Sequence, residues 1–125
     1  MTSSLRDAVT RHAATEAAKI ASMDRILAAI RAWNADGATV CKMSGGGREP
    51  LHTFLMGNKW RYVNDYRTVS VEGLGDGYYK CNVETRVARE YGGRDWRIDE
   101  STDCHSVKAV IDWLADRLAP YVTFP

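Results

Sequence analysis

The sequence is poor in the features that mark secreted and membrane proteins. It has only three cysteines, Cys41, Cys81 and Cys104, and this odd, scattered set argues against the disulfide framework of a small secreted domain. Charged residues interrupt every apolar run in residues 1–20, which argues against a signal peptide. No run approaches the ~18 apolar residues of a membrane span. We therefore expect a cytoplasmic protein with free thiols and no membrane contact.

Excess charge and cofactor motifs are also missing. The 17 Lys and Arg residues nearly balance the 16 Asp and Glu residues, so there is no overall field to attract nucleic acid or an anionic membrane. The cysteines and histidines show no paired C-x-x-C or H-x-x-x-H spacing, and no metal site is expected. The loop 44–48, Ser-Gly-Gly-Gly-Arg, lacks the Gly-Lys-Ser/Thr ending of a P-loop. No cofactor is expected.

Aromatic residues, in contrast, are plentiful. The chain of 125 residues is 45% hydrophobic and contains four Trp and six Tyr. Because aromatic side chains bury large areas, a core can close without disulfides or a metal. The length is typical of one domain, so residues 1–125 are predicted to form a single α+β domain.

A long helix is predicted near the N-terminus, since neither Gly nor Pro occurs between Leu5 and Trp33. Its apolar residues recur at three- and four-residue steps: Ile20, Met23, Leu27 and Ile30. Gly37 can adopt positive φ and is predicted to end the helix. Residues 1–18 have an incomplete apolar stripe. They are predicted to project, to fray, or to pair with a second copy as a homodimer.

The middle of the chain alternates like strands. Strand candidates cover 38–43, 51–56, 59–63, 66–71, 78–89 and 94–98, and glycines 73, 75 and 77 are expected to break the chain between the fourth and fifth. The clearest alternation places Tyr79, Cys81, Val83, Thr85 and Val87 on one face. Such one-sided strands are typical of an antiparallel sheet with one wet face.

A shorter helix is predicted at the C-terminus. Residues 99–103 are expected to form a polar connection, with Thr102 or Asp103 as the N-cap. The apolar stripe of this helix consists of Val107, Val110, Ile111, Leu114 and Leu118, and Pro120 ends it.

Together these elements predict an α+β fold. An antiparallel sheet of four to six strands would carry the long N-terminal helix and the shorter C-terminal helix packed on one face. The residues expected to be buried are Leu27, Ile30, Trp33, Val83, Trp96, Val110 and Leu114.

The absence of a specific catalytic motif favours a non-enzymatic protein-binding module, acting as an adaptor, a subunit or a small inhibitor of a larger macromolecule. Arg, Trp and Tyr are favoured at protein interfaces. The candidate contacts to another protein or protein complex are Arg48, Lys59, Arg61, Tyr66, Arg67, Arg86 and Arg97.

Two alternatives stay open. The basic-aromatic hairpin 59–67 could neutralise phosphates and stack bases of a nucleic acid or nucleotide, unless Trp60 and Tyr62 belong to the core. A small hydrolase would use either a metal held by acidic residues or a thiol. Its candidate residues are Asp95, Asp99, Glu100, Asp103 and, at the expected start of the last helix, Cys104.

Overall fold

The computed structural model describes residues 15–42, 45–88 and 92–125. Within these residues the chain is helical at 15–21 and then forms two longer helices and seven strands. In chain order they are α2 (Asp24–Ala35), β1 (Thr39–Cys41), β2 (Arg48–Glu49), β3 (Lys59–Asn64), β4 (Arg67–Gly75), β5 (Tyr78–Ala88), β6 (Arg94–Cys104), α3 (Val107–Leu118) and β7 (Val122–Thr123).

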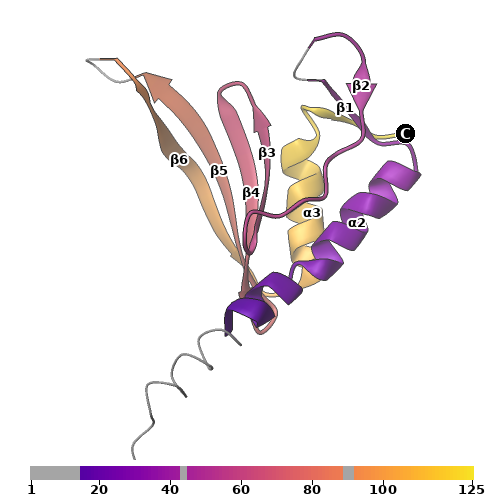
Figure 1. Cartoon of the computed structure of the whole chain (residues 1–125), viewed down its shortest axis with the longest axis vertical. Helices are drawn as coiled ribbons and strands as arrows, with labels where there is room; N and C mark the ends of the chain where they lie inside the picture. Colours follow the sequence, from indigo (N-terminus) through magenta and orange to yellow (C-terminus); the bar gives the residue numbers. More distant parts are fainter. Residues whose placement is uncertain (1–14, 43–44, 89–91) are drawn as a thin grey trace, which may run out of the picture.

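The strands form two antiparallel sheets. The larger sheet has the order β3-β4-β5-β6, and the smaller one has the order β2-β1-β7. The far ends of β5 and β6 pair only with each other, so they continue as a two-stranded ribbon beyond β3 and β4 (Figure 1). The predicted α+β class with an antiparallel sheet is therefore confirmed, and the small second sheet is an addition to it.

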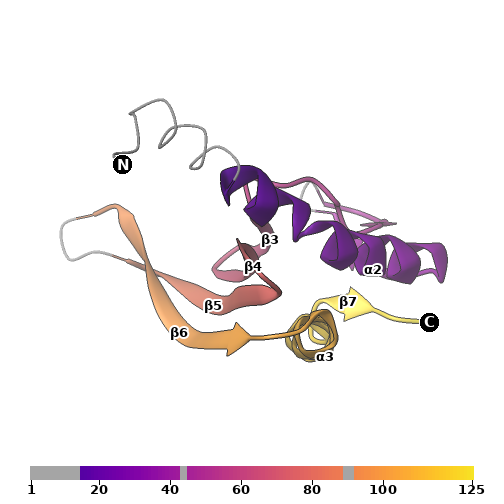
Figure 2. The ribbon, with the colours of Figure 1, turned by 90° about the horizontal axis from the view of Figure 1, so that it is seen from below.

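Both helices lie on the same side of the four-stranded sheet (Figure 2). Their buried residues form one core with the inner face of the sheet, the face turned toward the helices. The helices and the N-cap residue of α2 contribute Met23, Ile26, Leu27, Ile30, Val110, Leu114 and Leu118, and the sheet contributes Trp60, Tyr62, Val69, Val71, Tyr79, Cys81, Val83 and Cys104. The predicted stripes of α2 and α3 and the alternation of β5 account for most of this set.

One predicted strand is not a strand. Residues 51–55 have no strand pairing, because the backbone of Leu51 is tied to a helix side chain instead. Leu51 N–H donates to Asn34 Oδ1 at 3.0 Å, and Asn34 Nδ2 donates to the Leu51 carbonyl at 2.8 Å. Farther along, the Trp60 Nε1 atom donates to the His52 carbonyl at 3.0 Å. Long-range side-chain bonds thus replace the expected ladder.

The segment 99–103 is also different from the prediction, since it belongs to β6. A register shift between Val83 and Glu84 places an extra residue, Asp99, opposite no partner on β5. β6 continues past this β-bulge to Cys104. The last helix is capped later than expected, by Ser106, whose Oγ accepts from Ala109 N–H at 3.1 Å.

The bulge also explains why Trp96 is not buried. Beyond it, Trp96 and Ile98 point to the outer face of the sheet, the face turned away from the helices, where 44% of Trp96 is exposed. Trp33 is only partly buried, and Ile20 is exposed. These three residues were predicted to lie in apolar stripes or in the core.

The predicted long N-terminal helix is interrupted at residues 22–23, and residues 1–14 lie outside the described part of the chain. β4 passes close to this interruption and runs through Gly73 to Gly75 rather than breaking at Gly73. A Cβ atom at Gly73 would lie 2.3 Å from Ser22 Oγ and 2.7 Å from the Lys19 carbonyl. Glycine is therefore needed there for close approach, and not for a turn.

Candidate functional site

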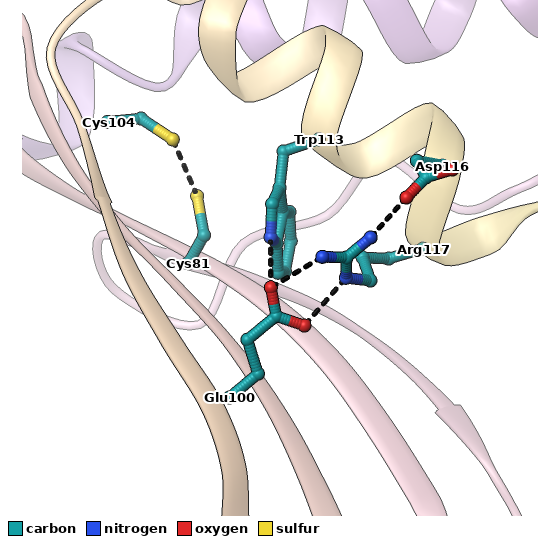
Figure 3. A network of polar contacts seen from close by, with 6 residues as sticks. All are labelled: Cys81, Glu100, Cys104, Trp113, Asp116 and Arg117. Atoms are coloured by element: carbon teal, nitrogen blue, oxygen red, sulfur yellow. Dashed lines mark hydrogen bonds and ion pairs between the residues drawn. The ribbon is translucent and has the colours of Figure 1, made fainter.

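The cysteine proposed as a nucleophile lies in the core. Cys104 ends β6 and does not start a helix, and its Sγ lies 3.8 Å from Cys81 Sγ on the neighbouring strand (Figure 3). Both thiols are buried. Burial, followed by the proximity of Cys104, raises the pKa of the Cys81 thiol well above its usual range. The two thiols therefore pack as part of the core, and the reactive thiolate form of Cys81 is disfavoured.

Glu100 of the acidic candidates ties the sheet to α3. Trp113 Nε1 donates to its Oε1 at 3.1 Å, and Arg117 donates to both carboxylate oxygens at 2.6 Å (Figure 3). The bonds from Arg117 hold the pKa of Glu100 at about 2, against the opposing effect of burial. This bidentate pair occupies the carboxylate, so Glu100 acts as a structural link.

Asp99 is occupied in a similar way. Thr85 Oγ1 donates to it, Arg97 Nε donates at 2.9 Å, and Arg67 lies at 3.9 Å. The hydrogen bond from Thr85 and then that from Arg97 lower the pKa of Asp99. A cavity of about 280 Å³ lies here, lined by two Arg and two carboxylates whose charges balance. In the described part of the chain, no three His, Cys, Asp or Glu side chains gather as a metal site.

The seven candidate contact residues do not share one surface. Arg67 and Arg97 meet at Asp99 on the inner side, whereas Lys59, Arg61 and Arg86 alternate onto the outer face. Arg48 lies on the small sheet and Tyr66 in the β3–β4 turn. In the hairpin 59–67, Trp60 and Tyr62 are buried in the core, so Tyr66 is its one exposed aromatic residue.

The described residues also form an apolar groove that sequence reasoning did not find. It has a volume of about 450 Å³ and opens between the small sheet, residues 50–56 and β3. Two exposed apolar side chains flank it, Phe54 (64% exposed) and Met56 (57%). The residues that line this groove are Val40, Cys41, Glu49, Pro50, Leu51, His52, Phe54, Met56, Arg61, Tyr62 and Val63. Its size is that of a ligand pocket.

His52 fastens one wall of the groove to β3. Its Nε2 lies 2.6 Å from the Arg61 carbonyl, which can only accept, so Nε2 carries the proton and donates. Its Nδ1 is buried without a hydrogen-bond partner in the described chain, and burial lowers the pKa of the ring. The Nε2 atom is thereby occupied, and among the described residues His52 makes no hydrogen bond to Cys41, the exposed thiol in the groove.

The edge of β3 beside this groove, called here the β3 edge, has unpaired backbone groups. In the two-residue hairpin, Asn64 and Arg67 form the closing hydrogen-bonded pair, so Tyr62 and Trp60 also point their backbone groups toward β4. The backbone groups of Lys59, Arg61 and Val63 then point outward. Lys59 has both of its backbone groups bonded, and Arg61 has one.

Lys59 exchanges two backbone bonds with Met56, at 2.8 and 3.1 Å, and the Arg61 carbonyl accepts from His52. These contacts confirm the outward direction of the odd-numbered residues. The Arg61 N–H and both backbone groups of Val63 find no partner among the described residues. They border the groove and form a short open stretch of sheet edge.

Comparisons of the whole chain with models of known families, with curated protein sequences and with solved structures give no match. Among the described residues, no helix has the length and apolar character required to cross a membrane.

Proposed function

We propose that this protein is a non-enzymatic protein-binding module that receives an extended segment of a partner protein in the groove along the β3 edge. The observation that carries this proposal is the open backbone of Arg61 and Val63 next to an apolar groove. In strand addition, main-chain hydrogen bonds supply affinity, and pockets for alternate side chains supply specificity. A module of this kind acts as an adaptor, a subunit or a small inhibitor.

The chemistry of the groove supports binding over catalysis. Its one imidazole, His52, uses Nε2 to bond the Arg61 carbonyl and makes no hydrogen bond among the described residues to the exposed thiol of Cys41, so no nucleophile–base pair is formed there. The nucleic-acid alternative has less support, since the burial of Trp60 and Tyr62 removes two of the three aromatic residues that would stack on bases.

The test is selection of binders from a displayed library of linear peptides, followed by mapping of where the selected peptides bind. Alkylation of Cys41 with a bulky maleimide should block the selected peptides, because this thiol lines the groove whereas Cys81 and Cys104 are buried. Val63→Pro should block them as well, because proline has no N–H to donate. Val63→Thr, which keeps the N–H, is the matched control.

Peptides that lose binding after both changes and keep it in the control support the proposal. Selected peptides that bind the alkylated protein and Val63→Pro as well as the wild type contradict it. Binding of single-stranded DNA with a steep salt dependence, unaffected by either change, favours the nucleic-acid alternative instead.

A further inference from the structure

We infer that the segment bound at the β3 edge runs antiparallel to β3 and carries an apolar residue followed directly by an acidic one. This inference deepens the proposed function and depends on it. It specifies the direction of the partner strand and the chemistry of two consecutive side chains. The three observations that carry it are the occupied Arg61 carbonyl, the position of the groove beside Tyr62, and the unpaired charge of Arg61.

The direction follows from which backbone groups are open. A parallel strand would place one residue between the Arg61 carbonyl and the Val63 N–H, and the Arg61 carbonyl is already occupied by His52 at 2.6 Å. An antiparallel strand instead places one residue opposite Val63, where it exchanges both hydrogen bonds. Two positions later, its backbone carbonyl accepts from the Arg61 N–H. Antiparallel addition therefore uses every open group of this edge.

The apolar residue is the one opposite Tyr62. Tyr62 lies on the inner face of β3, and side chains of directly opposite residues share a face. The partner side chain at that position enters the groove next to Val40 and Leu51, both of which are buried. A Leu, Ile or Val there removes apolar surface from water, which is the main source of affinity in such a groove.

The acidic residue is the one opposite Arg61. Arg61 is exposed on the outer face, and it forms no ion pair within residues 15–42, 45–88 and 92–125. Its neighbour on β4 is Ser70, which is uncharged. The next outward residue of β3 is Lys59, which lies directly opposite Glu72 of β4. A carboxylate opposite Arg61 on an added strand thus meets a cation that has no ion pair among the described residues, and opposite charges on directly facing residues stabilise a strand pair.

The order of these two residues along the partner is fixed by the direction. In an antiparallel strand, the residue opposite Tyr62 precedes the one opposite Arg61. A parallel strand reverses this order. The inference is therefore tested with two peptides of the same composition, one containing Thr-Leu-Asp-Thr and one containing Thr-Asp-Leu-Thr, each flanked by threonines and blocked at both ends.

Affinity is measured by NMR titration of the full chain, with the amide signals of Arg61 and Val63 as reporters. The Leu-Asp peptide should bind more tightly than the Asp-Leu peptide, by up to about fivefold for one cross-strand charge pair. Arg61→Glu should reverse the charge preference, so that a Thr-Leu-Lys-Thr peptide binds better than the Leu-Asp peptide. Arg31→Glu changes the net charge equally at an exposed position of α2, and it should leave the order of the peptide affinities unchanged.

Each remaining outcome contradicts one claim. Suppose that both peptides bind with equal affinity, that Arg61→Glu does not change these affinities, and that Val63→Pro blocks binding. The groove is then a binding site, but the inferred strand direction and the inferred acidic residue are wrong. If neither peptide perturbs Arg61 or Val63, or if Val63→Pro has no effect on binding, the proposed function itself fails. If the chain alone dimerises through this edge and Val63→Pro makes it monomeric, the occupant is a second copy and the inference is wrong.

Discussion

The two outer strands of the four-stranded sheet are protected in different ways. β6 is 11 residues long and is interrupted by the bulge at Asp99, and its side chains include both acids and bases. β3 is 6 residues long and regular, and atoms from residues 52–56 cover part of its edge. Exposed edges are templates for pairing with another chain, and bulges and charges are common means of preventing it.

The comparison shows that the two kinds of protection against pairing with another chain leave different backbone groups uncovered. One kind is built into the strand itself, and the other is supplied by a neighbouring segment. In β6 the bulge and the charges are distributed along the strand itself. In β3 the segment 52–56 bonds to the backbone of Lys59 and to the Arg61 carbonyl, and it leaves the Arg61 N–H and both backbone groups of Val63 uncovered. An open edge thus arises where a loop covers only part of a strand. Four predictions probe this difference between the strands.

The largest effect should come from Trp60, which anchors β3. This side chain is fully buried and donates to the His52 carbonyl, so it holds both β3 and the covering segment. Trp60→Ala should lower the free energy of unfolding by about 3–5 kcal/mol in a urea titration. Trp96→Ala on β6 is the control, because it removes a half-exposed ring and should cost far less. Equal decreases in the free energy of unfolding for Trp60→Ala and Trp96→Ala would contradict the placement of Trp60 in the core and of Trp96 on the outer face.

The second prediction concerns the attachment of β6 to α3. Because the pKa of Glu100 is about 2 in the folded chain and 4.5 ordinarily, its stabilising effect is complete above pH 4.5 and is lost as the pH falls toward 2. Glu100→Gln should cost about 1–2 kcal/mol at neutral pH and flatten this acid dependence. The exposed Asp112→Asn is the matched control. An unchanged acid profile in Glu100→Gln would show that the pair with Arg117 does not link the layers.

The third prediction concerns the cover over β3. The pKa of His52 is lowered from its ordinary 6.5 by burial, so protons bind the unfolded chain more tightly than the folded one. Stability should be greatest above pH 6.5, and it should fall as the pH drops through 6.5 until the folded ring itself titrates. Thermal unfolding across this range measures the effect. His52→Gln, which can still donate to the Arg61 carbonyl, should remove the slope, and persistence of the slope would rule out His52 as its source.

The smallest effect should come from Val63→Pro. The Val63 N–H points outward and has no partner, so its loss should change the free energy of unfolding by less than about 1 kcal/mol, as expected for proline on an edge strand. Ser70→Pro is the contrasting variant, because Ser70 lies in the central strand β4 and its N–H belongs to the ladder with β5. Comparable destabilisation by the two prolines would mean that the β3 edge is not open.

The sequence predicted the elements whose patterns are local. The alternation in 78–88 and the stripe of Val110, Leu114 and Leu118 depend only on neighbouring residues, and they agree with β5 and α3. The bulge at Asp99 depends on register with β5, so the exposure of Trp96 could not be inferred from β6 alone. The polar residues 99–103 predict a loop when they are considered alone, and only the pairing with β5 shows that they belong to a strand.

The groove could not be predicted for the same reason. Its walls come from β1, from residues 49–56 and from β3, and no single stretch shows the pattern. The irregular path of 51–55 depends on two bonds from Asn34, a residue 17 positions away in the chain. The hint that was present was the alternation of Arg61 with Trp60 and Tyr62, which correctly separated the solvent side of β3 from its core side.

The most direct test is amide hydrogen exchange along β3 in the free protein, followed by NMR. The Trp60 and Tyr62 amides, which pair with β4, should exchange slowly, whereas the Arg61 and Val63 amides should exchange quickly. A bound peptide should slow Arg61 and Val63 selectively. Slow exchange of Val63 in the free protein, comparable to that of Tyr62, would contradict the account, because the edge would then already have a partner.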